Sequence, residues 1–195
     1  MIVNTPFAVQ VYQATYPNYA DYCNTLTSAL VEFEQQTPSV HRSNQGGYQS
    51  PATLASVPAT QSLFEFIAAT AEKALRENYG IPFENIQIDS AWLNVNRGQG
   101  SHNQTHIHDG ILSGVFYVQT PSGSGKLNIM NPGMNTLWQG HQLTVQQNQN
   151  TAEVAFIHPT PGELYLWPSY VPHSVDTNSQ QDCERISISF NLSVS

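Results

Sequence analysis

Three histidines lie close together in the middle of the chain, and a fourth lies much further on. His102, His106 and His108 fall within seven residues, and the distant one is His173. Side chains at positions i and i+2 of a strand share one face, so a strand over 104–108 would let His106 and His108 bind one ion. A neighbouring strand could then add His173. Three protein ligands leave coordination positions open for reactants, although imidazole alone does not select iron over zinc, copper or nickel.

The other histidines do not fit this pattern. His102 is less well placed than His106, and we expect it beside the site or in solvent. His41, His141 and His158 are isolated in the sequence and indicate ordinary surface or packing positions.

An arginine interrupts the last apolar run of the chain. Arg185 begins the alternating segment Arg-Ile-Ser-Ile-Ser-Phe-Asn-Leu, in which Ser187 shares its face while Ile186 and Ile188 take the other. Such an arginine either faces water on a half-exposed sheet or faces inward, where it needs an anionic partner. Its planar guanidinium suits a carboxylate, and the Ser187 hydroxyl adds a further donor. We favour the inward arrangement, with a carboxylate ligand beside the metal.

Composition excludes some classes of partner. Charged residues make up only 10% of the 195 residues, against about 25% in typical globular proteins. The formal net charge is −8, and the six cations form no basic stripe for a phosphate backbone. We therefore expect no nucleic-acid backbone and no acidic membrane as a partner, although a single base could still enter a pocket. A homo-oligomer remains open.

The two cysteines and the N-terminus indicate the compartment. Cys23 and Cys183 are far apart and match no metal motif, so we expect free thiols in a reducing environment. The chain begins without a basic, apolar leader, and no stretch approaches the roughly 18 apolar residues of a membrane span. These features favour a soluble, cytoplasmic protein.

Periodicity divides the chain into a helical part and a strand-rich part. Residues 18–36 have apolar positions three and four apart, and Ser62–Glu65 has the capping-box pattern of a second helix that stops at Gly80. Residues 43–50 fit an irregular polar loop. From residue 86, short β-branched and aromatic runs predict strands near 86–96, 104–108, 111–119, 125–130, 142–147, 152–158, 162–167, 171–176 and 185–194.

The connections between these strands are too short for crossover helices. We therefore expect a mainly β protein with N-terminal helices, built as an antiparallel sandwich or jelly roll. It would form a single domain over 1–195, with a helical lead-in over 1–85 and a β core over 86–195.

Several segments together resemble the Fe(II)/2-oxoglutarate-dependent oxygenase superfamily, and more narrowly a group of such oxygenases from marine bacteria and their phages. The resemblance covers nearly the whole chain, and its helical part is the least specific. The matching segments are Ser43–Ser50, Ala91–Asn96, His106–His108, Leu112–Val118, Pro161–Ser169, Pro172–Val175 and Arg185–Asn191. The resemblance implies a cupin-like double-stranded β-helix.

The resemblance also implies roles for single residues. His106 and His173 match the two iron-binding histidines, and Arg185 with Ser187 matches the pair that binds the distal carboxylate of 2-oxoglutarate. Tyr117 matches a phenol that supports the same carboxylate or else packs in the core. Asn96, like Asn94, enters the site on a strand and could bind the co-substrate or serve an edge strand.

The middle iron ligand departs from the family pattern. The family usually has Asp or Glu two residues after the first histidine, and this chain has His108. Either His108 is itself the ligand, or Asp109 swings in from the following loop. A third arrangement shifts the frame, so that His108 is the first ligand and Gly110 occupies the carboxylate position, as in iron halogenases.

The implied reaction is oxidative decarboxylation of 2-oxoglutarate to succinate and CO2, coupled by Fe(II) and O2 to hydroxylation or another oxidation of a C–H bond. The substrate is a small molecule or an amino-acid side chain, which the sequence does not identify. The alternatives are a cupin-like metal-binding protein, a three-histidine dioxygenase independent of 2-oxoglutarate, and a structural jelly roll. The first two have no need of an inward Arg185, and in the third the histidines would not converge.

Overall fold

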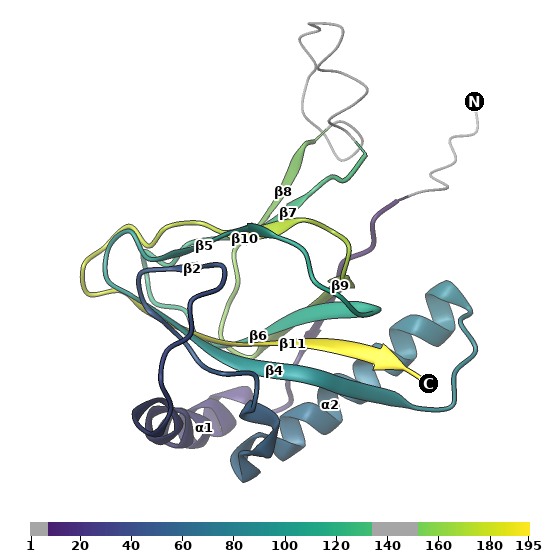
Figure 1. The fold of residues 1–195 in the computed structure, drawn as a ribbon, viewed down its shortest axis with the longest axis horizontal. Coiled ribbons are helices and arrows are strands. Elements are labelled where there is room, and N and C mark those ends of the chain that lie inside the picture. Colours follow the sequence, from purple (N-terminus) through teal and green to yellow (C-terminus); the bar gives the residue numbers. More distant parts are fainter. Residues whose placement is uncertain (1–7, 134–151) are drawn as a thin grey trace, which may run out of the picture.

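Two antiparallel sheets face each other, and two helices cover the outer face of the larger sheet (Figure 1). A computed structural model describes residues 8–133 and 152–195 of the chain. The strand expected over 142–147 and His141 lie outside the described residues. The mainly β, antiparallel architecture with N-terminal helices is confirmed.

The elements fall into helices, short helical turns and strands. The helices are α1 (Tyr19–Gln36) and α2 (Gln61–Ala74), and the short turns are η1 (Leu54–Ser56), η2 (Pro58–Thr60) and η3 (Leu75–Tyr79). The strands are β1 (Tyr12–Thr15), β2 (Asn44–Gln45), β3 (Tyr48–Gln49), β4 (Ile86–Arg97), β5 (His102–His106), β6 (Leu112–Gln119), β7 (Leu127–Met130), β8 (Val154–Ile157), β9 (Glu163–Pro168), β10 (His173–Val175) and β11 (Glu184–Val194).

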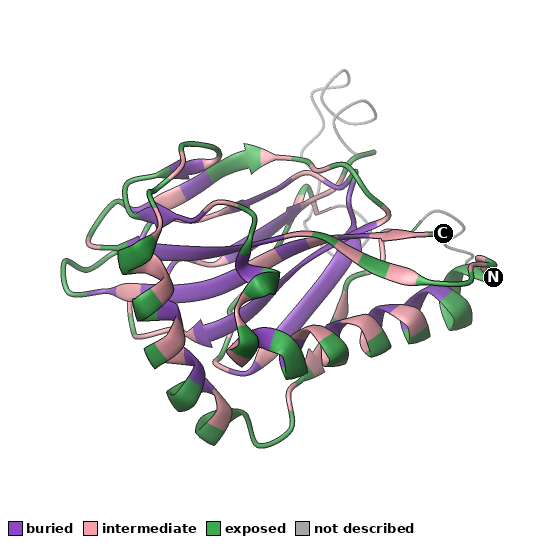
Figure 2. Ribbon diagram, turned by 60° about the horizontal axis from the view of Figure 1, so that its bottom comes forward, coloured by how far each residue is buried: buried purple, intermediate pink, exposed green. Residues whose placement is uncertain are grey.

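The larger sheet has the strand order β1-β9-β6-β11-β4-β3 and separates the core from the site. Alternate residues of its central strands, such as Ile186, Ile188 and Phe190 of β11, join one apolar cluster with the helices. The intervening residues face the smaller sheet, as the two-residue period of a strand requires. The central strands are almost wholly buried (Figure 2), so the residues on their inner face must be satisfied by each other or by a ligand.

Each helix packs one apolar stripe on the larger sheet. In α1 the buried residues are Cys23, Leu26 and Leu30, at the spacing that the sequence predicted. The second helix begins at Gln61, one residue before its predicted cap, because the one-turn helix η2 runs directly into it, so Ser62 lies inside the helix. Gly80 ends this helical stretch in the left-handed conformation, as predicted.

The smaller sheet has the order β2-β5-β10-β7-β8 and carries the histidines. His173 of β10 lies directly opposite His106 of β5 in the antiparallel register. The predicted strand over 104–108 is wrong at its end, because β5 stops at His106 and His108 lies in the connection to β6.

The segment predicted as an irregular loop contributes a short strand to each sheet. β2 pairs with β5 in the smaller sheet, and β3 pairs with β4 in the larger one. Between them Gly47 has a positive φ of 73°, and a Cβ there would lie 2.5 Å from the Val95 carbonyl oxygen. This crossing ties the two sheets together at the end where the histidines lie, and the first 85 residues therefore supply strands as well as helices.

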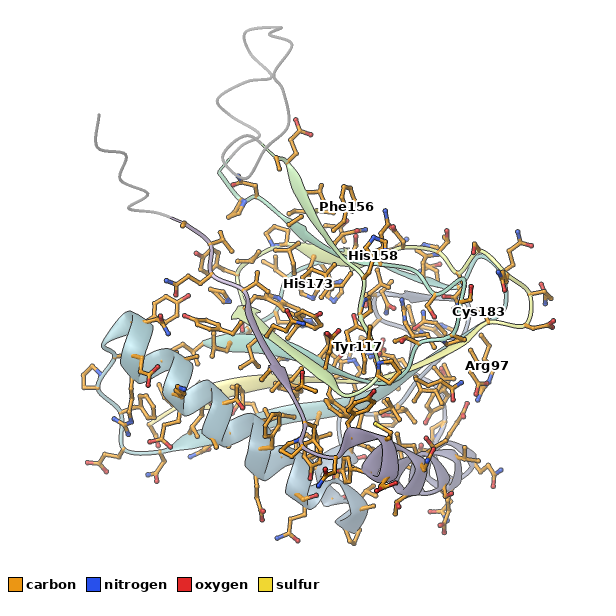
Figure 3. The ribbon with its side chains drawn as sticks, turned by 180° about the vertical axis from the view of Figure 1, so that it is seen from behind. Arg97, Tyr117, Phe156, His158, His173 and Cys183 are labelled. Carbon is orange, nitrogen blue, oxygen red and sulfur yellow. The ribbon has the colours of Figure 1, made fainter. Side chains whose placement is uncertain are left out.

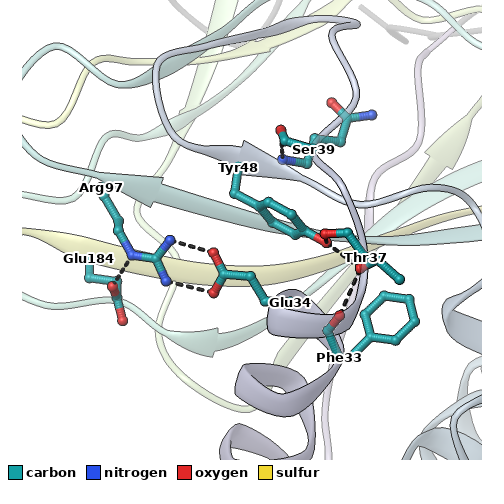
Figure 4. Close-up of polar contacts among 8 residues, drawn as sticks. Phe33, Glu34, Thr37, Ser39, Tyr48, Arg97 and Glu184 are labelled. Atoms are coloured by element: carbon teal, nitrogen blue, oxygen red, sulfur yellow. Dashed lines mark hydrogen bonds and ion pairs between the residues drawn. The ribbon is translucent and has the colours of Figure 1, made fainter.

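A three-residue ion cluster closes another end of the larger sheet (Figure 4). The guanidinium of Arg97, the last residue of β4, binds both carboxylate oxygens of Glu34 on α1 and one oxygen of Glu184, the first residue of β11. These ion pairs raise the pKa of Arg97 above its ordinary value. The cluster fixes α1 to the start of the strand that carries Arg185.

Candidate metal centre

Three histidines converge between the sheets. The ligand-capable nitrogens of His106, His108 and His173 all lie within 4.8 Å of one another. Their ring centroids are 4.3 Å apart for His106 and His173, 4.7 Å for His106 and His108, and 5.1 Å for His108 and His173. Seen from behind, His173 on the smaller sheet and Tyr117 on the larger one both point into the space between the layers (Figure 3). The structure therefore brings together the three histidines that the sequence singled out.

Backbone carbonyls orient two of the rings. Nδ1 of His106 lies 2.6 Å from the carbonyl oxygen of Gln104, and Nδ1 of His173 lies 3.0 Å from that of Val171. A carbonyl oxygen only accepts, so Nδ1 must donate the proton, and the lone pair of Nε2 is free. This outer hydrogen bond, which fixes tautomer and ring direction, is typical of metal-binding histidines.

Burial keeps the cluster neutral. Removal from water lowers the pKa of His106, and it lowers those of His108 and His173 to about 4 and about 3. Repulsion from the neighbouring imidazoles adds to the effect for His108 and His173. Three neutral imidazoles in one small volume suit a cation that shares their lone pairs.

The third histidine reaches the cluster from a turn rather than from a strand. The amide nitrogen of His108 donates to the Ser169 carbonyl oxygen at 3.1 Å, which fixes the chain just after β5. Gly110 follows with a φ of 107°, and a Cβ there would lie 2.8 Å from the Leu192 carbonyl oxygen. Asp109 is exposed and lies outside the ligand cluster found among the described residues.

The predicted bystanders stay apart from the cluster. Nδ1 of His102 lies 2.8 Å from the Gly100 carbonyl oxygen, and this side chain is no member of the ligand group. His41 and His158 are exposed, and Figure 3 shows His158 near the outer strand β8.

Aromatic rings enclose the cluster. The Trp167 ring lies 4.8 Å from that of His173, and the Trp92 ring lies 5.4 Å from that of His108. With Tyr117 and Ser187 they line a narrow inner cavity of about 40 Å³ that reaches the three histidines. This volume is close to that of one water molecule, so a larger ligand would have to widen the cavity.

Arg185 is a buried cation that forms no ion pair in the described part of the chain. Its side chain is on the inner face of β11, the residue is only 1% exposed, and burial lowers its pKa. Nη1 donates to the Gly125 carbonyl oxygen at 3.0 Å, whereas Nε has no partner. Within the described ranges 8–133 and 152–195, the ion pairs involve other cations. An uncompensated buried charge costs several kcal/mol, so the site is suited to an anion.

The other predicted co-substrate residues lie around this arginine. Ser187 pairs with Tyr117 across β11 and β6, and both line the inner cavity. Burial raises the pKa of Tyr117 to about 12, so its phenol stays protonated and can donate a hydrogen bond. Asn96 lies opposite Arg185 in the register, but its amide donates to Asn103 and it is not among the cavity-lining residues.

A wider hollow lies outside the histidines. It has a volume of about 600 Å³, and its walls include Arg42, Trp92, Ile107 and Asn191 as well as His106 and His108. Sequence reasoning missed these walls, because four segments that are distant in the sequence form them. The chain has only six Lys and Arg residues, so each of them is a candidate for a specific role, and this was the one signal in the sequence that pointed to Arg42.

Comparisons with known proteins agree with this geometry. Residues 90–191 match the family model described as "Putative 2OG-Fe(II) oxygenase". No curated protein sequence matches the chain significantly. Among solved structures, a Pseudomonas putida prolyl-4-hydroxylase has a TM-score of 0.62 at 12% identity, covering 93% of this chain and 91% of that chain.

Two further structures show the same fold. HygX from Streptomyces hygroscopicus, solved with nickel and 2-oxoglutarate bound, has a TM-score of 0.64 at 9% identity over 96% of this chain and 84% of its own. A prolyl hydroxylase from Trichoplax adhaerens, in complex with a peptide, has a TM-score of 0.58 at 10% identity, covering 93% of this chain and 83% of that chain. The facing sheets are thus the expected double-stranded β-helix. With more than half its length matched by the family model, the chain belongs to the 2-oxoglutarate- and Fe(II)-dependent oxygenases.

Proposed function

We propose that His106, His108 and His173 bind Fe(II) as a three-histidine site. The support is their mutual distance of at most 4.8 Å, together with the carbonyl bonds that leave Nε2 of His106 and His173 free. His108 takes the position that a carboxylate usually occupies in the family. The exposed Asp109 and the vacant-site arrangement at Gly110 are less favoured, because neither accounts for the convergence of His108 on the other two rings.

We further propose that Arg185 binds the distal carboxylate of 2-oxoglutarate. This single observation carries the assignment: a cation that is 1% exposed has an unpartnered Nε and forms no ion pair among the described residues. Ser187 and the protonated phenol of Tyr117 face the same cavity and would donate to that carboxylate. Asn96 would act indirectly, through the hydrogen bond that its side-chain amide donates to Asn103.

The function is oxidation of a C–H bond, with hydroxylation as the proposed outcome. The bound iron and 2-oxoglutarate supply the oxidising chemistry, and the protein supplies orientation and shielding. Trp92 and Trp167 exclude water from the cluster, and the wider hollow admits the substrate, a small molecule or an amino-acid side chain. In sum, 2-oxoglutarate, O2 and a C–H bond yield succinate, CO2 and an alcohol.

Two further proposals concern the domain organisation and the cellular location of the chain. We propose that residues 1–195 act as one domain, because strands from both halves share both sheets. Cys23 and Cys183 are free and buried, which supports a reducing, cytoplasmic location. None of the helices in the described part of the chain has the length and apolarity that a membrane span needs.

The experiment is an assay of succinate formation from 2-oxoglutarate with added Fe(II), ascorbate and O2. Wild-type protein should form succinate only when Fe(II) is present. His173→Ala should abolish it, and the matched control His158→Ala, an exposed histidine outside the cluster, should not. Succinate formation that survives His173→Ala would overturn the assignment.

A further inference from the structure

The hollow outside the histidines continues into a second one with charges of both signs. The first has a volume of about 600 Å³ and the second about 520 Å³. They share four lining residues, which are Arg42, Ile107, His108 and Asn191. A molecule in this joint hollow would lie against the outer side of the histidine cluster.

One wall holds an unpaired cation. Arg42 is exposed and makes no ion pair among the described residues, whereas Arg76, Arg97 and Lys126 each do. Its backbone is fixed, since its amide nitrogen donates to Oδ1 of Asn44 at 2.9 Å. The guanidinium is therefore available to an anionic group in the hollow.

The same hollow holds carboxylates. Asp109 is exposed and has no ion pair in the described part of the chain, and Asp89 accepts a hydrogen bond from Ser193. Arg42, His108 and Asp109 all line the second hollow, and the described residues show no ion pair between Arg42 and Asp109. Opposite charges held apart in this way fit a ligand that carries both signs.

An apolar side chain lies between the charges. Ile107 is 59% exposed although it stands between two histidines of the cluster. It lines both hollows, and Trp92 lines the first beside it. A hydrocarbon chain lying over Ile107 and Trp92 would be directed toward the histidines and would lose apolar contact with water.

We propose that the primary substrate is a free α-amino acid, whose carboxylate binds Arg42 and whose ammonium group binds Asp109. Its side chain then passes Ile107 toward the histidines and is the part that is oxidised. This inference deepens the proposed function and rests on it.

The test uses the intact protein loaded anaerobically with Fe(II) and 2-oxoglutarate, followed by O2. The probes are the twenty standard amino acids, their amides and their N-acetyl derivatives, and the readout is succinate formed above the level without probe. At least one free amino acid should raise succinate formation at least about tenfold, the effect of one charge-assisted contact. Its amide and its N-acetyl derivative should each lose that stimulation.

Variants assign the two ends of the substrate separately. Arg42→Gln should raise KM for the free amino acid about tenfold and remove the preference over its amide. Asp109→Asn should also raise KM for the free amino acid about tenfold, and it should remove the preference over the N-acetyl derivative. The visible band of the Fe(II)–2-oxoglutarate complex should persist in both variants. Lys73→Gln and Glu77→Gln, exposed charges on the α2–η3 stretch, are the matched controls.

The outcomes separate this inference from the proposed function. If the visible band does not form in wild-type protein, the proposed function fails first. If the band forms but no free amino acid stimulates turnover, or blocked derivatives stimulate equally, the zwitterion inference is wrong. If Arg42→Gln raises KM for the amide and for the free amino acid by the same factor, the inference is also wrong.

Discussion

Replacing Arg185 by methionine separates its cost to the fold from its role in binding. The guanidinium is buried, one of its nitrogens has no partner, and it forms no ion pair with a described carboxylate. Methionine fills much of the same volume without a charge to desolvate. A buried charge that lacks a partner is destabilising, so we expect Arg185→Met to leave the melting temperature of the ligand-free protein unchanged or higher.

The same substitution should remove most of the affinity for 2-oxoglutarate. Loss of one partner of a buried charged pair costs about 2–5 kcal/mol, which corresponds to a Kd higher by roughly 30- to 1000-fold or more. With 2-oxoglutarate at 100 times its Kd, the wild-type protein gains about 2.7 kcal/mol. For a chain of this length that is a rise in Tm of about 5–10 °C.

The assay is thermal unfolding under anaerobic conditions with Fe(II), with and without 2-oxoglutarate. Wild-type protein and the control Arg76→Met, an exposed cation on the η3 turn, should show the rise in Tm. Arg185→Met should show at most about a third of that rise, because a Kd about 30-fold higher leaves 2-oxoglutarate at only about three times Kd. A rise in the variant equal to that of the wild type would refute the role of Arg185, and a large loss of Tm without ligand would refute the unbalanced-charge argument.

Three further predictions concern the histidine cluster. His108→Asp, which restores a carboxylate at the middle position, should keep Fe(II) affinity within about tenfold of wild type in a metal titration, whereas Asp109→Asn should not change it. The pKa of His173 falls from 6.5 unfolded to about 3 folded, so the unfolded state binds more protons in that window and stability falls with falling pH. For His173 alone this is a loss of roughly 2 kcal/mol from pH 6.5 to 5 in denaturant unfolding of the metal-free protein. Because burial also lowers the pKa of His108, His173→Gln should reduce this pH dependence without abolishing it, and a pH-independent wild type would contradict the argument. Gly110→Ala should cost roughly 1–3 kcal/mol, because it places a Cβ at positive φ against the Leu192 carbonyl, and it should weaken Fe(II) binding by displacing His108; an unchanged Tm would count against this.

Strand periodicity predicted the inner face of β11 correctly. Ile186 and Ile188 pack toward the helices, while Ser187 lines the cavity and Arg185 is buried beside it. This worked because a two-residue period assigns faces without knowledge of the partner strands. The antiparallel direction of the strands was also accessible, because the connections were too short for crossover helices, but the order of the strands in the two sheets was not predicted.

His108 shows where local reasoning failed. The i and i+2 rule placed it on the same strand as His106, yet it reaches the cluster from a turn held by Ser169 and Gly110. That turn depends on contacts with β9 and β11, which are distant in sequence. The hollow around Arg42 was missed for the same reason, since its walls come from four segments that are distant in the sequence.

The central claim is that three histidines hold Fe(II) beside an arginine that holds 2-oxoglutarate. Anaerobic titration of the protein with Fe(II) and 2-oxoglutarate, followed by visible absorption, tests it most directly. The account predicts a charge-transfer band that saturates at one iron and one 2-oxoglutarate per chain and is lost in His173→Ala but retained in His158→Ala. No band in the wild-type protein, or an undiminished band in His173→Ala, would contradict it.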